Sequence, residues 1–457
     1  MTTGEDSCNI LMVVAIDIGT TYSGYAYSFK AKYEKDKLNI QTNQVWNSGL
    51  KSLLSLKTST CILINKDTKE FDSFGFDAED AYEDKIFENQ ADKYYFFDRF
   101  KMVLYNSETI SKDMEITDVR GNTFPAIEVF ALAIQALKQS LMEKCVKQDV
   151  KIKSNEIKWV LTVPAIWNDN AKEFMRMSAI KAGIREDRLV IALEPEVASI
   201  YCQHLPPDKI TGAPDGFSVA DGSNYLLVDL GGGTIDITAH HKINMDYLEE
   251  LSRASGGACG ERTNLKTFLL VGGFSESPLI QEIIRQNFPD MHIISPEDPI
   301  LAVLKGAVLF GHKPDFITSR FTRHTYGRRI RPLFDESKHD PKKRVTGEDG
   351  DRLPLDEVVT LVYHTVDSRQ KSVSVAIYCT NKDKTDYVDD EGCVKLVEFS
   401  VPIPNPSGQR RYVDVQFKFG MAKLKFQLPR DKQGKKPCIT VSYKLVGYSG
   451  HLNFPNA

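Results

Sequence analysis

Two glycine-rich segments with the same pattern, 212 residues apart, constrain the fold of this chain more than any other feature. The first reads VVAIDIGTT at 13–21, and the second reads LLVDLGGGT at 226–234. Each is an apolar run that ends at an aspartate and turns at glycine and threonine, and each is followed by a second strand-like run, at 25–29 and 235–239. The sequence therefore predicts two β-hairpins, related as a pseudo-repeat of two lobes.

The predicted turns combine a carboxylate, hydroxyl groups and backbone N–H groups, which Mg²⁺ and a polyphosphate require of their site. One such turn alone is equally compatible with an ordinary tight turn. Two of them facing each other can hold one Mg-nucleotide between the lobes, with Asp17 and Asp229 on the metal ion. The residues expected on the phosphates are Gly19, Thr20, Thr21, Gly231, Gly232, Gly233 and Thr234.

Between and after the hairpins, strands alternate with helices. Apolar strands at 159–165 and 267–271 are each followed by a predicted helix, one over 168–181 and one that begins after Pro278. A longer core-facing helix is predicted from Pro125 onward by apolar residues at helical spacing. This alternation favours an α/β architecture.

The pattern changes past residue 311. Short β-branched runs, divided by proline, glycine and charged turns, predict a β-rich domain, and the polar stretch before them is the predicted linker. The expected boundaries are a first domain at 10–311, with lobes at about 10–200 and 220–311, a linker at 312–355, and a β-rich domain at 356–457.

Composition excludes several classes of protein. Apolar residues make up 42% and charged residues 26% of the 457 residues, which argues against a mainly disordered chain. No run reaches about 18 uncharged apolar residues, and the apolar start at 10–16 meets Asp17, so we expect no membrane span and no export signal. The eight cysteines show no Cys-Xaa-Xaa-Cys spacing, which favours reduced thiols.

In their order, these motifs resemble the nucleotide-binding domain of the seventy-kilodalton heat-shock chaperones, within the actin and sugar-kinase superfamily. The resemblance covers roughly residues 10–310 and rests on the stretches 16–23, 163–195, 228–236, 270–278 and 296–307. Two departures from the common pattern, Phe274-Ser275-Glu276 and Glu196-Val197, make the chain similar to the divergent branch called heat-shock protein twelve-like.

The resemblance implies a two-lobed, actin-like (ribonuclease H-like) ATPase fold that binds ATP or ADP with Mg²⁺. It implies that Glu194 orients the attacking water, that Asp236 supports the metal ion and water, and that Lys101 lies near the γ-phosphate. Glu194 also suits a helix N-terminal carboxylate, Arg99 competes with Lys101, and a solvated surface lysine stays open. The resemblance also places Gly272 and Gly273 in the adenosine loop.

One part of the resembling pattern is absent from the sequence. Only 34 positions separate Thr234 from Phe268, where family members place a subdomain of about a hundred residues that clamps adenine. The join near 261–264 looks like an internal deletion. We therefore expect a truncated second lobe, with weakened ATP binding and hydrolysis.

Together these features predict an ATP-binding, chaperone-like heat-shock protein of the stress response, and leave open whether it is a weak ATPase. Two alternatives are a non-catalytic adaptor on the same fold and a small-molecule kinase, although the 163–195 segment disfavours the kinase. The expected partners are nucleotide and, through the β-rich domain, client polypeptides or adaptor partners. The arginine cluster at 320–331 favours a solvated face over nucleic acid, because the whole chain has a net charge of −4. The expected location is the cytoplasm, with the nucleus as an alternative.

Overall fold

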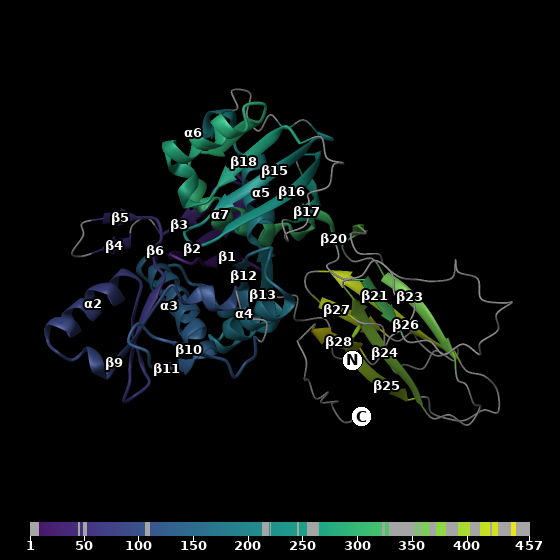
Figure 1. Ribbon diagram of the computed structural model, residues 1–457, viewed down its shortest axis with the longest axis horizontal. Coiled ribbons are helices and arrows are strands. Elements are labelled where there is room, and N and C mark those ends of the chain that lie inside the picture. Colours follow the sequence, from purple (N-terminus) through teal and green to yellow (C-terminus); the bar gives the residue numbers. More distant parts are fainter. Residues whose placement is uncertain are drawn as a thin grey trace. The chain divides into compact units, whose positions relative to one another are not determined.

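The computed structural model describes residues 9–43, 46–48, 53–105, 110–212, 219, 221–244, 246–253, 265–321, 325–328, 352–354, 358–364, 372–380, 392–402, 412–420, 423–427 and 440–444. The chain divides into two units, Met1–Ile317 and Thr318–Ala457. The first is a mixed α/β unit, and it holds every motif that the sequence predicts for nucleotide binding (Figure 1).

The first sheet of this unit is built around the predicted N-terminal hairpin. Its strands are β1 (Met12–Ile18), β2 (Tyr22–Phe29), β3 (Gln41–Thr42), β6 (Thr58–Ser59), β12 (Ile157–Val163) and β13 (Leu189–Leu193). They run in the order β13-β12-β1-β2-β3, and β6 also pairs with β2. β13, β12 and β1 are parallel, whereas β2 returns antiparallel to β1.

The second sheet repeats this order around the second predicted hairpin. Its strands in the first unit are β14 (Ile210–Thr211), β15 (Asn224–Leu230), β16 (Ile235–Asn244), β17 (Tyr247–Arg253), β18 (Thr267–Val271) and β19 (His292–Pro296). They run β19-β18-β15-β16-β17, with β14 beside β19. β19, β18 and β15 are parallel and β16 is antiparallel, so each sheet has a hairpin with two parallel strands on the same side.

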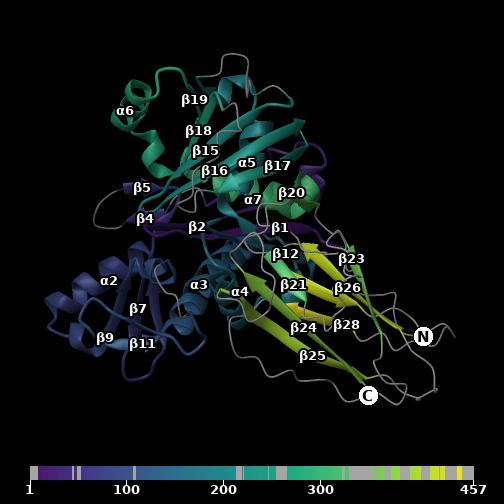
Figure 2. The ribbon, with the colours of Figure 1, turned by 45° about the vertical axis from the view of Figure 1, so that its right-hand side comes forward.

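Two helices lie between these sheets in both ribbon views (Figures 1 and 2). α5 (Glu194–His204) and α7 (Ala302–His312) pack against each other, α7 on β1 and β12 and α5 on β15 and β16. Their approach is very close at Gly306, where an added Cβ atom would lie 1.7 Å from the carbonyl oxygen of Val197. The glycine therefore fixes the spacing of the two helices.

Further helices cover the outer faces. α3 (Ala126–Lys147) and α4 (Asp169–Lys181) pack together and bury their apolar residues in the large core under the first sheet. The Asn168 side chain caps α4 by accepting a hydrogen bond from the backbone N–H of Ala171 at 2.9 Å. α6 (Pro278–Asn287) places Ile280 and Ile284 on the second sheet.

The remaining elements of the first unit are short. A small sheet of β7 (Cys61–Asn65), β8 (Phe71–Phe74) and β9 (Tyr94–Asp98) packs against α2 (Phe76–Phe87). The others are α1 (Lys30–Tyr33), β4 (Trp46–Ser48), β5 (Leu53–Ser55), β10 (Glu115–Thr117), β11 (Thr123–Pro125) and the 3-10 turns η1 (Ala91–Lys93), η2 (Phe100–Leu104), η3 (Ser154–Glu156), η4 (Glu186–Arg188), η5 (Pro207–Lys209), η6 (Gly273–Glu276), η7 (Pro299–Leu301) and η8 (Pro314–Phe316). No helix among the described residues is both long and apolar enough to cross a membrane.

The regular structure described for the second unit consists of strands. They are β20 (Ile317–Phe321, which begins in the first unit), β21 (Thr325–Arg328), β22 (Arg352–Pro354), β23 (Val358–His364), β24 (Ser372–Thr380), β25 (Val394–Pro402), β26 (Tyr412–Gly420), β27 (Lys423–Gln427) and β28 (Thr440–Lys444). β21-β24-β25 form one sheet and β23-β26-β27-β28 another, all antiparallel.

Two predicted features fall partly or wholly outside the described residues. Within the predicted linker at 312–355, β20, β21 and β22 are described, whereas 329–351 are not. The predicted deletion at 261–264 lies outside the described residues altogether.

Candidate functional site

Both hairpin turns line one cavity of ≈ 670 Å³ in the first unit. Most residues that the sequence singles out belong to its wall: Asp17, Gly19, Thr20, Thr21, Lys101, Glu194, Asp229, Gly231, Gly232, Thr234, Asp236, Gly272 and Gly273. Gly233 is not part of the lining. The fold thus brings residues from five separate segments to one place, while their individual roles stay predictions.

The two turns touch each other at glycines. A Cβ atom added to Gly232 would lie 2.2 Å from Thr21 Oγ1, and one added to Gly233 would lie 2.5 Å from Thr20 Cγ2. A side chain at either position would push the turns apart. Glycine is therefore the residue that allows the backbones of both turns to border a common space.

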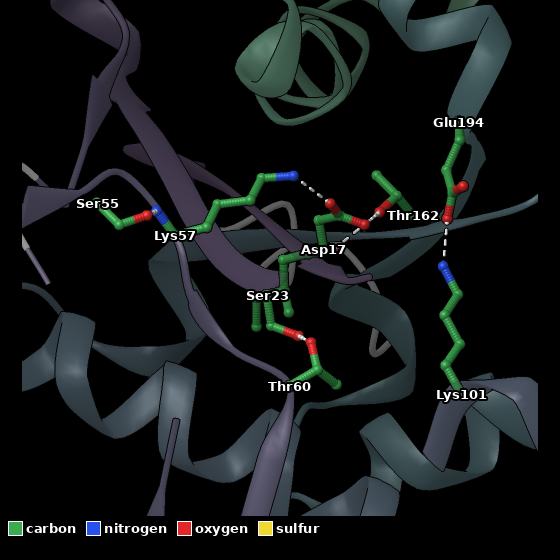
Figure 3. A network of polar contacts seen from close by, with 9 residues as sticks. Asp17, Ser23, Ser55, Lys57, Thr60, Lys101, Thr162 and Glu194 are labelled. Carbon is green, nitrogen blue, oxygen red and sulfur yellow. Dashed lines mark hydrogen bonds and ion pairs between the residues drawn. The ribbon is translucent and has the colours of Figure 1, made fainter. Parts of the chain in front are cut away.

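Asp17, at the end of β1, is buried and has partners on both carboxylate oxygens (Figure 3). The Lys57 ammonium donates to Asp17 Oδ2 at 2.7 Å, and Thr162 Oγ1 donates to Oδ1 at 2.8 Å. Burial alone would raise the pKa of Asp17, but the charges of Lys57 and Lys101 and the two hydrogen bonds outweigh it and hold the pKa below its usual value. Asp17 is therefore an ionised carboxylate whose negative charge is balanced by the Lys57 ammonium.

Asp229, at the end of β15, has a different neighbour. It lies directly opposite Asp236 in the β15–β16 register, and both carboxylates are buried. Among the described residues, no lysine or arginine forms an ion pair with either one. Burial and the charge of Asp236 raise the pKa of Asp229 to about 7, and burial also raises the pKa of Asp236.

Gly272 supports this second aspartate. The residue has φ +86°, and a Cβ atom there would lie 2.4 Å from Asp229 Oδ1 and 2.5 Å from the carbonyl oxygen of Leu230. Only glycine combines that backbone angle with so close an approach. Gly273, the next residue, has room for a side chain, since Ile300, at 3.8 Å, is the only described residue near its Cβ position.

Lys101 and Glu194 form the second buried ion pair of the cavity, at 2.8 Å (Figure 3). Lys101 comes from η2 and Glu194 from the first residue of α5. Burial, together with the charges of Asp17 and the Asp229–Asp236 pair, outweighs Lys101 and raises the pKa of Glu194 to about 8. Burial would lower the pKa of Lys101, but the carboxylates around it raise that pKa above its usual value.

The Thr21 hydroxyl is the feature of the cavity wall that points to a ligand. Its Oγ1 is buried and has no hydrogen-bond partner among the residues that the structure describes. A buried hydroxyl without a partner costs free energy unless something else supplies one. Because Thr21 lines the cavity beside the backbone of Gly231 and Gly232, an anionic oxygen in the cavity would complete its hydrogen bonding.

A metal ion fits this wall less well than a phosphate. Both oxygens of Asp17 are engaged by Lys57 and Thr162. In the part of the chain that the structure describes, no group of three or more His, Cys, Asp or Glu side chains is arranged to hold a metal ion. The assignment of Asp17 and Asp229 to a metal therefore stays a prediction.

Sequence reasoning missed Lys57 and Thr162. Lys57 lies between β5 and β6, outside every motif, and reaches Asp17 because β6 pairs with β2. Thr162 follows Leu161, which pairs with Ile16, so the parallel register itself places it beside Asp17. The strand predicted at 159–165 contained that signal, whereas nothing in the sequence pattern marked Lys57. Phe274, Ile300 and Val303 add apolar surface to the cavity.

Comparison with known proteins finds relatives whose sequences align with nearly the whole of this chain. Heat shock 70 kDa protein 12A of Homo sapiens is 27% identical over 91% of this chain and 89% of its own length. Heat shock 70 kDa protein 12B of Homo sapiens is 25% identical over 91% of this chain and 88% of its own length. A heat shock protein of Pyricularia oryzae is 26% identical over 49% of this chain and 33% of its own length. No protein-family model matches the chain.

These relatives confirm the resemblance to the twelve-like branch of the seventy-kilodalton heat-shock proteins. The alignment with the human 12A protein extends over 608 positions, more than the 457 residues of this chain, so the relative carries residues that this chain lacks.

Proposed function

We propose that this chain is an ATP- or ADP-binding, chaperone-like protein whose first unit is an actin-like, two-lobed nucleotide-binding domain. The proposal rests on one observation above all: two sheets of the same strand order present Asp-ended turns to one cavity. The heat-shock names of the relatives support the chaperone-like part of the proposal.

In this proposal the phosphates lie against the two turns. The buried Thr21 hydroxyl and the backbone N–H groups of 232–234 donate to phosphate oxygens, and the Lys101 ammonium lies on the same wall. The nucleoside lies near Gly272, Gly273 and the half-exposed ring of Phe274. When Mg²⁺ accompanies the nucleotide, it neutralises phosphate charge.

Weak hydrolysis is part of the proposal. The Lys101 ammonium already holds the Glu194 carboxylate at 2.8 Å, so Glu194 is less available to accept the proton of an attacking water. The second contribution is the truncated second lobe, which we place at the join near 261–264 and which removes the adenine wall. The longer alignment of the relatives supports a missing segment.

We assign client polypeptides or adaptor partners to the second unit, whose described regular structure is entirely β. The proposed location is the cytoplasm, with the nucleus as the alternative. A non-catalytic adaptor and a small-molecule kinase remain the two competing functions, and the nucleotide experiment separates them.

The test is calorimetric titration of the full chain with ATP and with ADP in Mg²⁺, beside the variant Gly273→Leu. The Gly273 Cβ position has only an ordinary contact with Ile300, and both residues line the cavity, so the added side chain fills the cavity without disturbing the backbone. We expect micromolar binding by the wild type and at least tenfold weaker binding by the variant, with equal circular dichroism.

Binding of neither nucleotide by a folded chain would contradict the proposal and favour the adaptor. Transfer of the γ-phosphate of ATP to a sugar, followed by product analysis, would favour the kinase.

A further inference from the structure

We infer that the Lys57 ammonium takes the place of a divalent cation at Asp17, so that phosphate binding in this cavity does not depend on a metal ion bound there. The inference rests on the proposed nucleotide function and concerns the cation at the phosphate end of the cavity. It begins from the contacts of Lys57, which belong to no motif in the sequence.

A cation that neutralises a polyphosphate has to lie in the cavity, and a carboxylate beside it can hold it there. Lys57 meets both conditions, since it lines the cavity and its Nζ lies 2.7 Å from Asp17 Oδ2. Its side chain is 8% exposed, so the charge is shielded from bulk water and acts at close range. A divalent ion bound by the same oxygen would lie close to the ammonium, and the repulsion between the two positive charges opposes its binding.

The ammonium keeps the capacity to bind a phosphate. A lysine has three N–H donors, and within the described part of the chain Lys57 Nζ donates only to Asp17. The remaining donors are available to oxygens of a ligand in the cavity. Thr162 holds the other carboxylate oxygen, so Asp17 is fixed between two donors and holds the ammonium in place.

The backbone around this lysine leaves room for its stem. Lys57 is held by the pairing of β6 with β2 and by a hydrogen bond from its backbone N–H to Ser55 Oγ at 3.3 Å. The residue opposite Asp17 across the hairpin is Gly24, and a Cβ atom there would lie 3.1 Å from Lys57 Cγ. A larger residue at that position would crowd the lysine stem away from Asp17.

The charges of the cavity show why such a cation is needed. Its wall holds five carboxylates, Asp17, Glu194, Asp229, Asp236 and Glu276, against three cations, Lys57, Arg99 and Lys101. The Lys101 ammonium forms an ion pair with Glu194. Without Lys57, a polyphosphate at the first turn would also face the unbalanced negative charge of Asp17.

Two measurements on the full chain test the inference, with Lys57→Met as the variant that removes the charge and keeps the length of the stem. The first is electron paramagnetic resonance of free Mn²⁺ during titration with protein alone. We expect the wild type to leave submillimolar Mn²⁺ free, and Lys57→Met to bind one ion per chain, because Asp17 then has an open oxygen. Binding of Mn²⁺ by the wild type, abolished by Asp17→Asn, would overturn the inference.

The second measurement is ATP affinity in EDTA and in Mg²⁺. We expect the wild-type affinity to differ by less than about threefold between the two buffers, and Lys57→Met to lose about tenfold or more in EDTA and regain it in Mg²⁺. A wild-type loss of more than tenfold in EDTA would overturn the inference while leaving the nucleotide function intact.

The wild-type measurements decide the question even if Lys57→Met does not fold. If a folded chain binds ATP in neither buffer, the proposed function fails, and the Mn²⁺ titration still decides whether Lys57 excludes a metal ion from Asp17.

Discussion

The two hairpins of the first unit have the same strand pairing, but the charges around their aspartates differ. In both hairpins, β1–β2 and β15–β16, an aspartate lies near the end of the first strand. The residue seven positions later lies opposite this aspartate on the second strand. In the first hairpin that residue is Gly24, and in the second it is Asp236. The parallel neighbour also differs: Thr162 hydrogen bonds with Asp17, whereas Val271 stands beside Asp229 and has no polar side chain.

These neighbours give the two aspartates opposite properties. Asp17 has a lowered pKa and a matched charge, whereas Asp229 has its pKa raised to about 7 and a second carboxylate facing it. A repeated backbone motif therefore fixes where a carboxylate lies, but not whether it is ionised. The side chains on the adjacent strands decide that, and four predictions test the contrast.

The largest expected effect is at Gly272, which packs against the second aspartate. Gly272→Ala should destabilise the fold by about 4 kcal/mol, because the alanine must combine a positive φ with contacts of 2.4 Å to Asp229 and 2.5 Å to Leu230. Denaturant unfolding measures the change. The matched control is Gly222→Ala, at φ +82°, where no described residue lies within 4 Å of the added Cβ atom and the cost should be only about 1 kcal/mol. Equal losses in the two variants would contradict the described packing.

The next effect comes from one substitution made at both aspartates. Asp17→Asn should cost about 3 kcal/mol at pH 8, because it leaves the Lys57 charge buried without its partner. Asp229→Asn should instead be neutral or stabilising by about 1 kcal/mol, because it removes a charge that faces Asp236. Denaturant unfolding of both variants in the same buffer gives the signs. The same sign at both positions would refute the asymmetry.

The third effect is the pH dependence of this difference. A carboxyl whose pKa rises on folding stabilises the protein fully below its unfolded pKa, and this stabilisation is lost as pH rises through the folded pKa. For Asp229 the pKa rises from 3.8 to about 7, so wild-type stability should fall as the pH rises through that window.

Asp229→Asn lacks this titration. Its stability relative to the wild type should therefore grow from about pH 4 to pH 7 and stay constant above, as thermal unfolding at several pH values would reveal. A difference that does not change with pH would show that Asp229 titrates normally.

The smallest effect on stability is expected at Thr21, on the turn of the first hairpin. Thr21→Val should change the free energy of unfolding by less than about 1 kcal/mol, because its buried Oγ1 has no partner to lose. ATP affinity should nevertheless fall about tenfold, because the hydroxyl is a proposed phosphate donor. Thr238→Val is the control, since Thr238 Oγ1 is also buried without a partner in the described part of the chain, but Thr238 does not line the cavity. Equal affinities in the two variants would remove Thr21 from the site.

Much of the first unit could be predicted from sequence because its signals are local. The alternation of apolar residues and the glycine turns locate both hairpins, and Asn168 and Gly183 mark the start and end of α4. The contacts that set the charge of the site are not local. Lys57 reaches Asp17 through the pairing of a two-residue strand, which is too short to leave a pattern in the sequence. The opposition of Asp229 and Asp236 is also visible only once the register of the hairpin is known.

The contact between the two turns has a kinetic consequence. Thr21 and Gly232 are 211 residues apart in the chain, yet their atoms leave no room for a methyl group between them. Contacts between residues far apart in the sequence form more slowly than local ones, so we expect the hairpins β1–β2 and β15–β16 to form from their own short turns before the two turns meet. The cavity is then among the last parts of the first unit to assemble. A molecule that bridges both turns would bind only the finished fold and slow its unfolding.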